Sequence, residues 1–192
     1  VNRTLSAEAG VSLQSAQTAA ESAGLRLALD LGARGSCTLG GTAATNAGGN
    51  SVVRYGMMRE QVLGLEAVLA DGTVVSSMNR LLKNNAGYDL KQLFIGTEGT
   101  LGIITRAVLR LRPALRSRNT AFVAIDDYVN VPLLLKHLGS SLGGSLTAFE
   151  VLWEDFYNTV VVERDRHAPP VEAGHPWYVL VEARGGKQEE DV

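Results

Sequence analysis

Residues 40–49 read Gly40-Gly41-Thr42-Ala43-Ala44-Thr45-Asn46-Ala47-Gly48-Gly49, and no side chain in this run is larger than that of asparagine or threonine. A backbone without bulky side chains can lie against a flat ring or a pyrophosphate, with its N–H groups aimed at phosphate or carbonyl oxygens. Thr42, Thr45 and Asn46 add short polar groups that can orient such a ligand. The alternative is a glycine-rich surface loop that binds nothing.

A second glycine run lies at residues 96–104, Gly96-Thr97-Glu98-Gly99-Thr100-Leu101-Gly102-Ile103-Ile104. Its G-x-x-G-x-x-G spacing differs from the dinucleotide fingerprint, and a strand follows it where the fingerprint requires a helix. Glu98 suits a ribose, an adenine edge or a pair of backbone N–H groups better than a pyrophosphate. The alternative is a tight turn that enters a strand.

A third run, residues 83–90, mixes amide, phenol and charged side chains. It either lines a polar pocket, or Tyr88 packs while Asp89 caps the turn that follows. Of these two alternatives we favour packing and capping.

The elements expected from the pattern begin with a helix over residues 12–23, capped by Ser12 and ended by Gly24. Residues 36–56 carry no helical period and predict a loop. Residues 61–70 and 73–75 flank Asp71-Gly72, which is a strong hairpin signal. Residues 103–112 alternate as a half-buried strand that Pro113 ends.

Residues 114–119 predict a linker, because the character of the sequence changes after Pro113. We expect strands at 120–125, 145–151 and 177–183, with helices at 131–142 and 155–163. This β-α-β-α-β order resembles most of a split βαβ sandwich.

Composition excludes several classes of function. The chain has 192 residues, 20% of them charged, and a formal net charge of -2, which argues against nucleic-acid partners. No apolar run is long enough to span a bilayer. Cys37 is the only cysteine, so no internal disulfide forms. His137, His167 and His175 occur singly, and we expect no metal site in this chain.

Taken together, these motifs resemble the FAD-binding domain of the vanillyl-alcohol oxidase superfamily, in its D-2-hydroxy acid dehydrogenase group. They occur in the order and at the spacing of that family. The motifs are Cys37 to Gly49, Arg54-Tyr55-Gly56, Val62-Leu63-Gly64-Leu65-Glu66, Leu69-Ala70-Asp71-Gly72 and Gly96 to Thr105. Asp30-Leu31-Gly32-Ala33, residues 85–96 and Thr147-Ala148-Phe149-Glu150 resemble the D-2-hydroxyglutarate dehydrogenase branch most.

The resemblance implies an α+β fold. Residues 1–115 would form the second half of an FAD-binding domain of the VAO/PCMH type, without its upstream pyrophosphate-loop half. Residues 116–192 would begin the ferredoxin-like substrate domain of FAD-linked oxidases. The family also has a strand between Leu5 and Ala9, which we expect to be missing here.

The resemblance also implies that FAD is the cofactor. Residues 40–49 would contact the flavin and the pyrophosphate, and residues 98–104 would close over the cofactor. The residues expected to bind FAD are Gly40, Gly41, Thr42, Thr45, Asn46, Gly48, Gly49, Tyr55, Gly56, Glu98, Gly99, Gly102, Ile103 and Ile104.

The implied reaction is the oxidation of a small D-2-hydroxy acid to a 2-oxo acid, with D-2-hydroxyglutarate ahead of D-lactate and glycolate. Flavin N5 would take a hydride while a base removes the hydroxyl proton, and a separate electron acceptor would reoxidise the flavin. The family's metal-binding histidines and basic substrate-binding residues would follow Val192. We therefore assign no catalytic residue here, and any divalent metal would bind outside this segment.

Further expectations are that the chain is part of a longer polypeptide and is inactive alone. The resemblance leaves room for a homodimer, and it implies a cytoplasmic location, or the mitochondrial matrix in a eukaryote. Two alternatives stay open at this point. One is a non-catalytic flavin-fold subunit of an oxidoreductase complex, and the other is an α+β domain without a cofactor.

Overall fold

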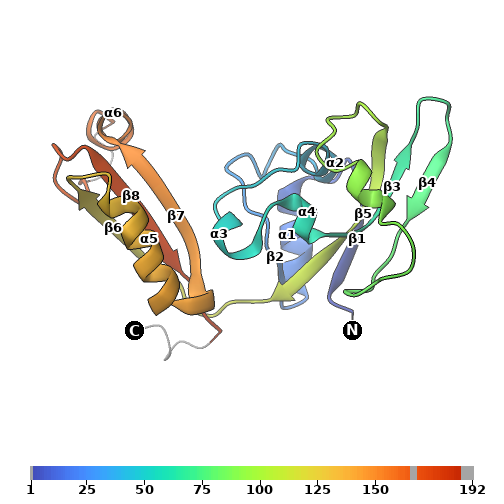
Figure 1. Cartoon of the computed structure of the whole chain (residues 1–192), viewed down its shortest axis with the longest axis horizontal. Coiled ribbons are helices and arrows are strands. Elements are labelled where there is room, and N and C mark those ends of the chain that lie inside the picture. Colours follow the sequence, from blue (N-terminus) through green and yellow to red (C-terminus); the bar gives the residue numbers. More distant parts are fainter. Residues whose placement is uncertain (1, 165–167, 187–192) are drawn as a thin grey trace. The chain divides into compact units, whose positions relative to one another are not determined.

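The structure is a computed structural model that describes residues 2–164 and 168–186. It divides into two compact units, Val1–Ala114 and Leu115–Val192 (Figure 1). The boundary falls inside the segment predicted as a linker, where the strand ending at Pro113 leaves the first unit. None of the helices within the described residues is both long and apolar enough to cross a membrane.

The first unit is built on an antiparallel sheet. Its central strand β5 (Ile103–Pro113) pairs with β1 (Thr4–Glu8) on one side and with β3 (Val62–Val68) on the other. β4 (Val74–Ser77) pairs with the outer edge of β3, and β2 (Leu25–Leu27) pairs with the last residues of β5. The long strand β5 therefore pairs with every other strand of this sheet except β4 (Figure 1).

The Asp71-Gly72 hairpin is confirmed. Val68 pairs with Val74, and the N–H of Leu69 donates to the carbonyl of Thr73 over 2.9 Å. Gly72 adopts a left-handed backbone with φ of 86°, which glycine tolerates without steric cost. The N–H of Thr73 donates to Asp71 Oδ1 over 2.9 Å, and this bond lowers the pKa of Asp71.

The first predicted helix is also confirmed, as α1 (Leu13–Ser22). The Ser12 side chain accepts a hydrogen bond from the N–H of Ser15, which satisfies one free donor of the first turn. Gly24 has a φ of 68° and ends the helix in the left-handed region. Leu13, Ala16 and Ala20 are buried on one face of α1.

Two expectations for the first unit were wrong. The supposed loop at residues 36–56 contains α2 (Leu39–Ala44) and α3 (Val52–Tyr55), followed by α4 (Met58–Gln61). These helices are too short for a hydrophobic period to show, and α2 depends on its Thr38 cap and its buried face. The strand expected to be missing between Leu5 and Ala9 is present as β1, which is paired along its length with β5.

A single apolar core lies between the sheet and the helices of the first unit. α1 and α2 supply Leu13, Ala16, Leu39 and Ala43, and Met58 of α4 is fully buried. The sheet contributes Leu65 and Ala67 from β3 and Ala107 and Leu109 from β5. The expected helical turn near residues 89–93 is the 3-10 helix η1 (Leu90–Leu93), and Phe94 after it enters the same core.

The second unit has the predicted split βαβ arrangement. β6 (Asn119–Ile125) and β7 (Leu146–Trp153) each pair antiparallel with β8 (Trp177–Ala183), which lies between them. α5 (Asn130–Ser141) connects β6 to β7, and a 3-10 turn at Gly143–Ser145 precedes β7. The last predicted helix is instead a short α6 (Glu154–Tyr157) that continues as a π-helical turn, Asn158–Val162.

Side chains pack on both faces of this second sheet. Val131, Leu134 and Leu138 of α5 pack on Val179 and Val181 of β8. On the other face, the rings of Tyr157 and Tyr178 stack with centroids 3.8 Å apart, and both side chains are fully buried. Phe122 of β6 contacts both rings, so α6 is held to the sheet by an aromatic cluster.

Candidate functional site

The two glycine runs meet at the end of α2. The N–H of Gly96 donates to the carbonyl of Ala43 over 3.1 Å, and the N–H of Glu98 donates to that of Ala44 over 2.9 Å. These carbonyls belong to the last turn of α2, where the carbonyl groups of a helix have no regular intrahelical N–H donors. Gly96, Glu98 and Gly99 all have a left-handed backbone, with φ of 83°, 53° and 84°. The second run thus wraps around the C-terminal end of the helix formed by the first.

A groove of about 380 Å³ lies where these runs meet the sheet. Three short segments form its walls: the residues after β1, helix α2 with its cap, and the turn that enters β5. The lining residues are Ala9, Gly10, Thr38, Gly40, Gly41, Ala44, Glu98, Gly99, Gly102, Ile103 and Ile104. The structure therefore brings together Gly40 and Gly41 from the first run and all five predicted residues of the second.

Two of the groove's glycines are required by close packing. A Cβ atom on Gly40 would lie 2.6 Å from the Cβ of Ala9, so only glycine lets α2 approach the end of β1. A Cβ on Gly102 would lie 2.9 Å from the carbonyl oxygen of Val68 and 3.1 Å from the ring of Phe94. These glycines set the shape of the groove.

The backbone donors that face the groove differ from those expected. The N–H of Gly40 donates to the carbonyl of Ala9 over 2.8 Å, and that of Gly41 donates to Thr38 Oγ1 over 3.1 Å. Within the described part of the chain, the N–H groups of Gly10, Gly99 and Gly102 have no intramolecular acceptor. All three residues line the groove, so their amides are candidate donors for a ligand there, and the exposed Glu98 of the same lining is a candidate acceptor.

Three predicted polar residues do not line the groove. Thr42 is buried, and its hydroxyl donates to the carbonyl of Leu39 over 2.9 Å. The Thr45 hydroxyl donates to the carbonyl of Gly41 over 2.9 Å. Asn46 Oδ1 accepts the N–H of Arg59 over 2.9 Å. Their side chains hold α2 and α4 in place within the chain.

The remaining predicted residues, Gly48, Gly49, Tyr55 and Gly56, also lie outside this groove. A Cβ on Gly49 would lie 2.0 Å from the carbonyl oxygen of Asp30, and one on Gly48 would lie 3.0 Å from Val52 Cγ2. Gly56 has a φ of 73° and packs against Glu60. The Tyr55 ring lies near the guanidinium groups of three arginines.

Three residues that were not predicted to bind the cofactor also line the groove, namely Ala9, Gly10 and Thr38, together with Ala44 of the first run. The small residues Ala9-Gly10 just before a helix were the available signal. Arg59 contacts residues that are far from it in the sequence. Its guanidinium donates to the carbonyl of Gln92 over 2.9 Å and to that of Ile95 over 2.5 Å. It thereby fixes the segment that leads into Gly96, and no local pattern predicts such a long-range contact.

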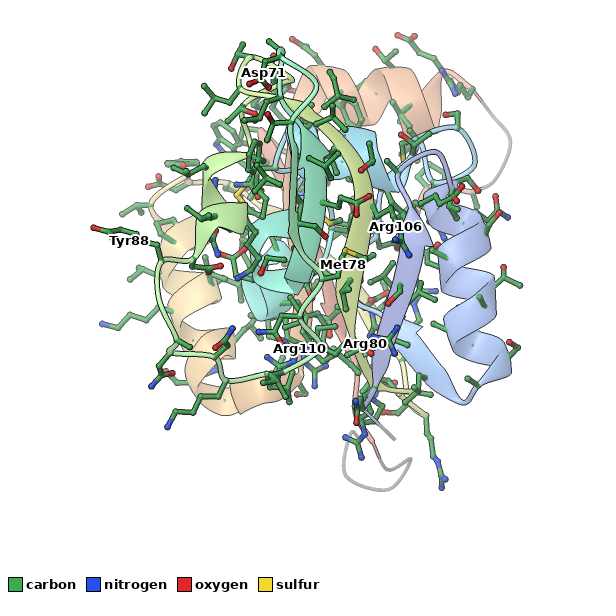
Figure 2. All side chains as sticks on the ribbon, turned by 90° about the vertical axis from the view of Figure 1, so that its right-hand side faces the viewer. Asp71, Met78, Arg80, Tyr88, Arg106 and Arg110 are labelled. Atoms are coloured by element: carbon green, nitrogen blue, oxygen red, sulfur yellow. The ribbon has the colours of Figure 1, made fainter. Side chains whose placement is uncertain are left out.

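The expectation that Tyr88 packs and Asp89 caps the next turn, in residues 83–90, was wrong. Tyr88 is 96% exposed and projects to solvent (Figure 2). Asp89 makes no capping bond and instead pairs with Lys91 Nζ over 2.5 Å, an interaction that lowers the pKa of Asp89.

Of the three histidines, His175 pairs with Asp126 over 2.6 Å, His137 lies in α5, and His167 falls outside the described residues. Within the described ranges, no three His, Cys, Asp or Glu side chains gather as a metal site.

Residues 1–77 match the family described as FAD binding domain. The whole chain is 42% identical over 191 residues to mitochondrial D-2-hydroxyglutarate dehydrogenase of Arabidopsis thaliana, and covers 34% of that protein. Over 185 residues, or 96% of the chain, it is 43% identical to the Bos taurus enzyme of the same name, again covering 34% of the relative.

Solved structures show the same fold. A structure of alkyldihydroxyacetonephosphate synthase superposes with a TM-score of 0.75 at 19% identity, over 97% of this chain and 36% of that one. The expected α+β fold is thereby confirmed. The match to the FAD binding domain supports FAD as the cofactor and argues against a domain without one. Residues 1–77 therefore match an FAD binding domain, and the chain spans about a third of the length of the D-2-hydroxyglutarate dehydrogenase relatives it matches.

Proposed function

We propose that the protein carrying this chain is an FAD-dependent dehydrogenase that oxidises a D-2-hydroxy acid to the 2-oxo acid, with D-2-hydroxyglutarate as the first candidate substrate. The observation that carries the proposal is the alignment of the entire chain, at 42% identity, with a D-2-hydroxyglutarate dehydrogenase. The alignment extends well past the FAD-binding segment at residues 1–77, so both units of the chain share in the similarity.

The groove beside α2 fits part of FAD. It is lined by small residues, and it offers the unpaired amides of Gly10, Gly99 and Gly102 together with the Glu98 carboxylate. Backbone N–H groups suit phosphate or carbonyl oxygens, and a carboxylate suits ribose hydroxyls. FAD is longer than this groove, so the remainder of the cofactor needs contacts elsewhere. Thr42, Thr45, Asn46, Gly48, Gly49, Tyr55 and Gly56 remain proposed as residues that contact or support the flavin.

The chemistry of hydride acceptance would be supplied by FAD once it is bound. This chain's own residues would hold and orient the cofactor. Gly40 and Gly102 let the groove walls close together, and the contacts of Arg59 hold the segment before Gly96. Their role is therefore positioning, because a groove held by packed elements fixes a bound group in one orientation.

The two units receive separate roles in this proposal. Residues 1–115 are assigned to part of the FAD-binding domain, and residues 116–192 to the beginning of the substrate domain. The catalytic base and any divalent metal are assigned to parts of the protein beyond this segment. A separate electron acceptor, a homodimer and a location in the mitochondrial matrix or the cytoplasm complete the proposal, and several relatives carry "mitochondrial" in their names.

The test uses protein expressed from the complete open reading frame and loaded with FAD. D-2-hydroxyglutarate, D-lactate and glycolate are added without oxygen while the flavin absorbance is recorded, and L-2-hydroxyglutarate serves as the stereochemical control. Bleaching by a D-acid and not by the L-acid supports the dehydrogenase. A flavin that stays oxidised with all three candidate acids contradicts it and favours the non-catalytic flavin-binding subunit.

A further inference from the structure

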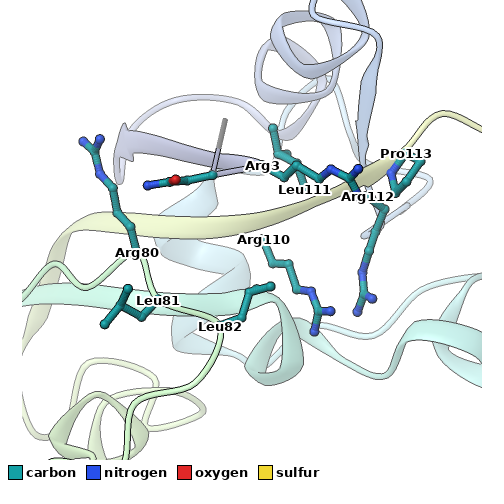
Figure 3. Close-up of a pocket in the computed structure, with 9 residues that line it drawn as sticks. Arg3, Arg80, Leu81, Leu82, Arg110, Leu111, Arg112 and Pro113 are labelled. Carbon is teal, nitrogen blue, oxygen red and sulfur yellow. The ribbon is translucent and has the colours of Figure 1, made fainter.

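A second cavity, of about 570 Å³, lies in the first unit beside the end of β5. We name it the arginine pocket. Its charged lining consists of Arg3, Arg80, Arg110 and Arg112, and its apolar lining includes Leu81 and Leu82 (Figure 3).

The arginine pocket is distinct from the groove beside α2. The groove is lined by Ala9 and Gly10 after β1 and by Ile103 and Ile104 at the start of β5. The arginine pocket is lined by Arg3 before β1 and by Arg112 at the end of β5. The two sites therefore lie at opposite ends of the same pair of strands, about 25 Å apart at the usual rise of a strand.

Positive charge is concentrated in the arginine pocket without a balancing acid. Arg110 and Arg112 are two residues apart on β5, so both leave the same face of the strand, and Figure 3 shows them extending in the same direction. No carboxylate is among the residues that line the pocket. The ion pairs of the described residues leave out Arg110 and Arg112, whereas Arg106 on the same strand has Glu66 at 4.0 Å.

Arg112 also lies beside the ring of Tyr55, which is near two further arginines. The guanidinium carbons of Arg26, Arg54 and Arg112 lie 5.2, 5.1 and 5.6 Å from the centre of its ring. The face of a phenol ring attracts a cation such as the Arg112 guanidinium, but it carries no full negative charge. Nε of Arg112 is buried and has no hydrogen-bond acceptor in the described structure.

The surroundings oppose the charge of Arg112. Burial, followed by the nearby charge of Arg110, lowers the pKa of Arg112, and the charge of Arg54 acts in the same direction. A guanidinium nevertheless stays protonated at neutral pH. A cluster of like charges with a buried, unused donor costs free energy that a bound anion would recover.

We propose that the arginine pocket is a binding site for a small oxyanion that carries at least two negative charges, as a phosphate-bearing or polycarboxylate compound does. The planar guanidinium groups of Arg110 and Arg112 offer paired N–H donors that match the oxygens of phosphate and carboxylate groups. This site is separate from the flavin groove, and the proposal does not rest on the proposed dehydrogenase function.

The experiment is isothermal titration of the purified protein with pyrophosphate and with citrate, at low and constant ionic strength. We expect saturable binding at one site, and the tighter of the two probes identifies the chemistry as phosphate or carboxylate. Arg110→Gln keeps a long polar side chain and should weaken binding roughly tenfold, the loss expected for a charge-assisted hydrogen bond. Arg106→Gln, on the same strand but outside the pocket, should bind as the parent does.

Three results would overturn the proposal. The first is the absence of saturable binding by either probe. The second is equal affinity of the parent and Arg110→Gln. The third is loss of probe binding in protein that carries one equivalent of bound FAD and no free FAD, which would place the anion in the flavin site. Circular dichroism of each variant checks the fold, and Arg80→Gln, which alters an exposed side chain of the lining, gives a second variant if Arg110→Gln unfolds.

Discussion

The backbone N–H of Glu98 donates to the carbonyl of Ala44 over 2.9 Å, and this bond joins the two glycine runs through residues that are 54 positions apart in the sequence. Glu98 forms it with a φ of 53°, in the left-handed region that residues other than glycine rarely adopt. From this conformation, and from the exposure of the side chain at a groove, we infer that the Glu98 carboxylate contacts the ligand.

Replacing Glu98 with glycine separates the stability of this turn from its binding role. Glycine adopts the left-handed backbone without strain, so the free energy of unfolding should stay within about 1 kcal/mol of the parent. The affinity for FAD should fall, because the carboxylate is lost. Urea unfolding and FAD titration of the full-length protein check the two effects. Equal FAD affinity in Glu98→Gly and the parent would remove Glu98 from the proposed cofactor contacts.

Filling the groove should lower FAD occupancy without unfolding the protein. Gly41 lines the groove and is exposed, and a Cβ on it would meet only Thr38 Oγ1, at 3.1 Å. Gly41→Val therefore places two methyl groups in or beside the space proposed for the cofactor. The matched control is Gly139→Val in α5, where a Cβ would meet nothing within 4 Å. Flavin content per protein after purification is the measurement, and undiminished flavin in Gly41→Val would contradict the assignment of the groove.

Sequence patterns predicted those elements whose stabilising contacts are local or strictly periodic. The Asp71-Gly72 hairpin, α1 with its Ser12 cap and the split βαβ unit each carry such a pattern. α2 was missed because a six-residue helix contains less than two turns, too few for a period to show. It forms because Thr38 caps it and because Leu39 and Ala43 are buried in the core.

The candidate site was predictable in part for the same reason. Glycine spacing identified both runs, but it could not show which residues face the ligand. Thr42 resembles a binding residue in the sequence, yet its hydroxyl bonds the carbonyl of Leu39 inside the helix. Arg59 gives no local signal, because its partners at Gln92 and Ile95 are brought near only by the tertiary fold.

Gly49 should be among the least replaceable positions of the first unit. Its φ is 96°, and a Cβ there would lie 2.0 Å from the carbonyl oxygen of Asp30. Gly49→Ala combines an unfavourable backbone with a clash against the main chain, so we expect a loss of about 2–4 kcal/mol in the free energy of unfolding. Urea unfolding followed by circular dichroism measures it. Gly32→Ala is the control, because a Cβ on Gly32 meets nothing within 4 Å, and similar losses in both variants would show that the clash is not the cause.

Glu182 should make the stability of the second unit depend on acid. Burial would raise the pKa of Glu182, but hydrogen bonds and charges from Arg184 and Arg118 outweigh it and hold the pKa below its ordinary value. A lowered pKa in the folded state means that the stabilisation is complete at neutral pH. It is lost as the pH falls below the pKa of an ordinary glutamate, about 4.3.

Glu182→Gln should lower the free energy of unfolding by about 1–3 kcal/mol at pH 7, since Arg184 and Arg118 then lose the carboxylate of Glu182. Both tryptophans, Trp153 and Trp177, lie in this unit, so urea unfolding followed by their fluorescence reports on it alone. The difference between parent and variant should shrink on moving from pH 7 to pH 3, and a difference that stays constant would show that the ionised carboxylate does not stabilise the fold.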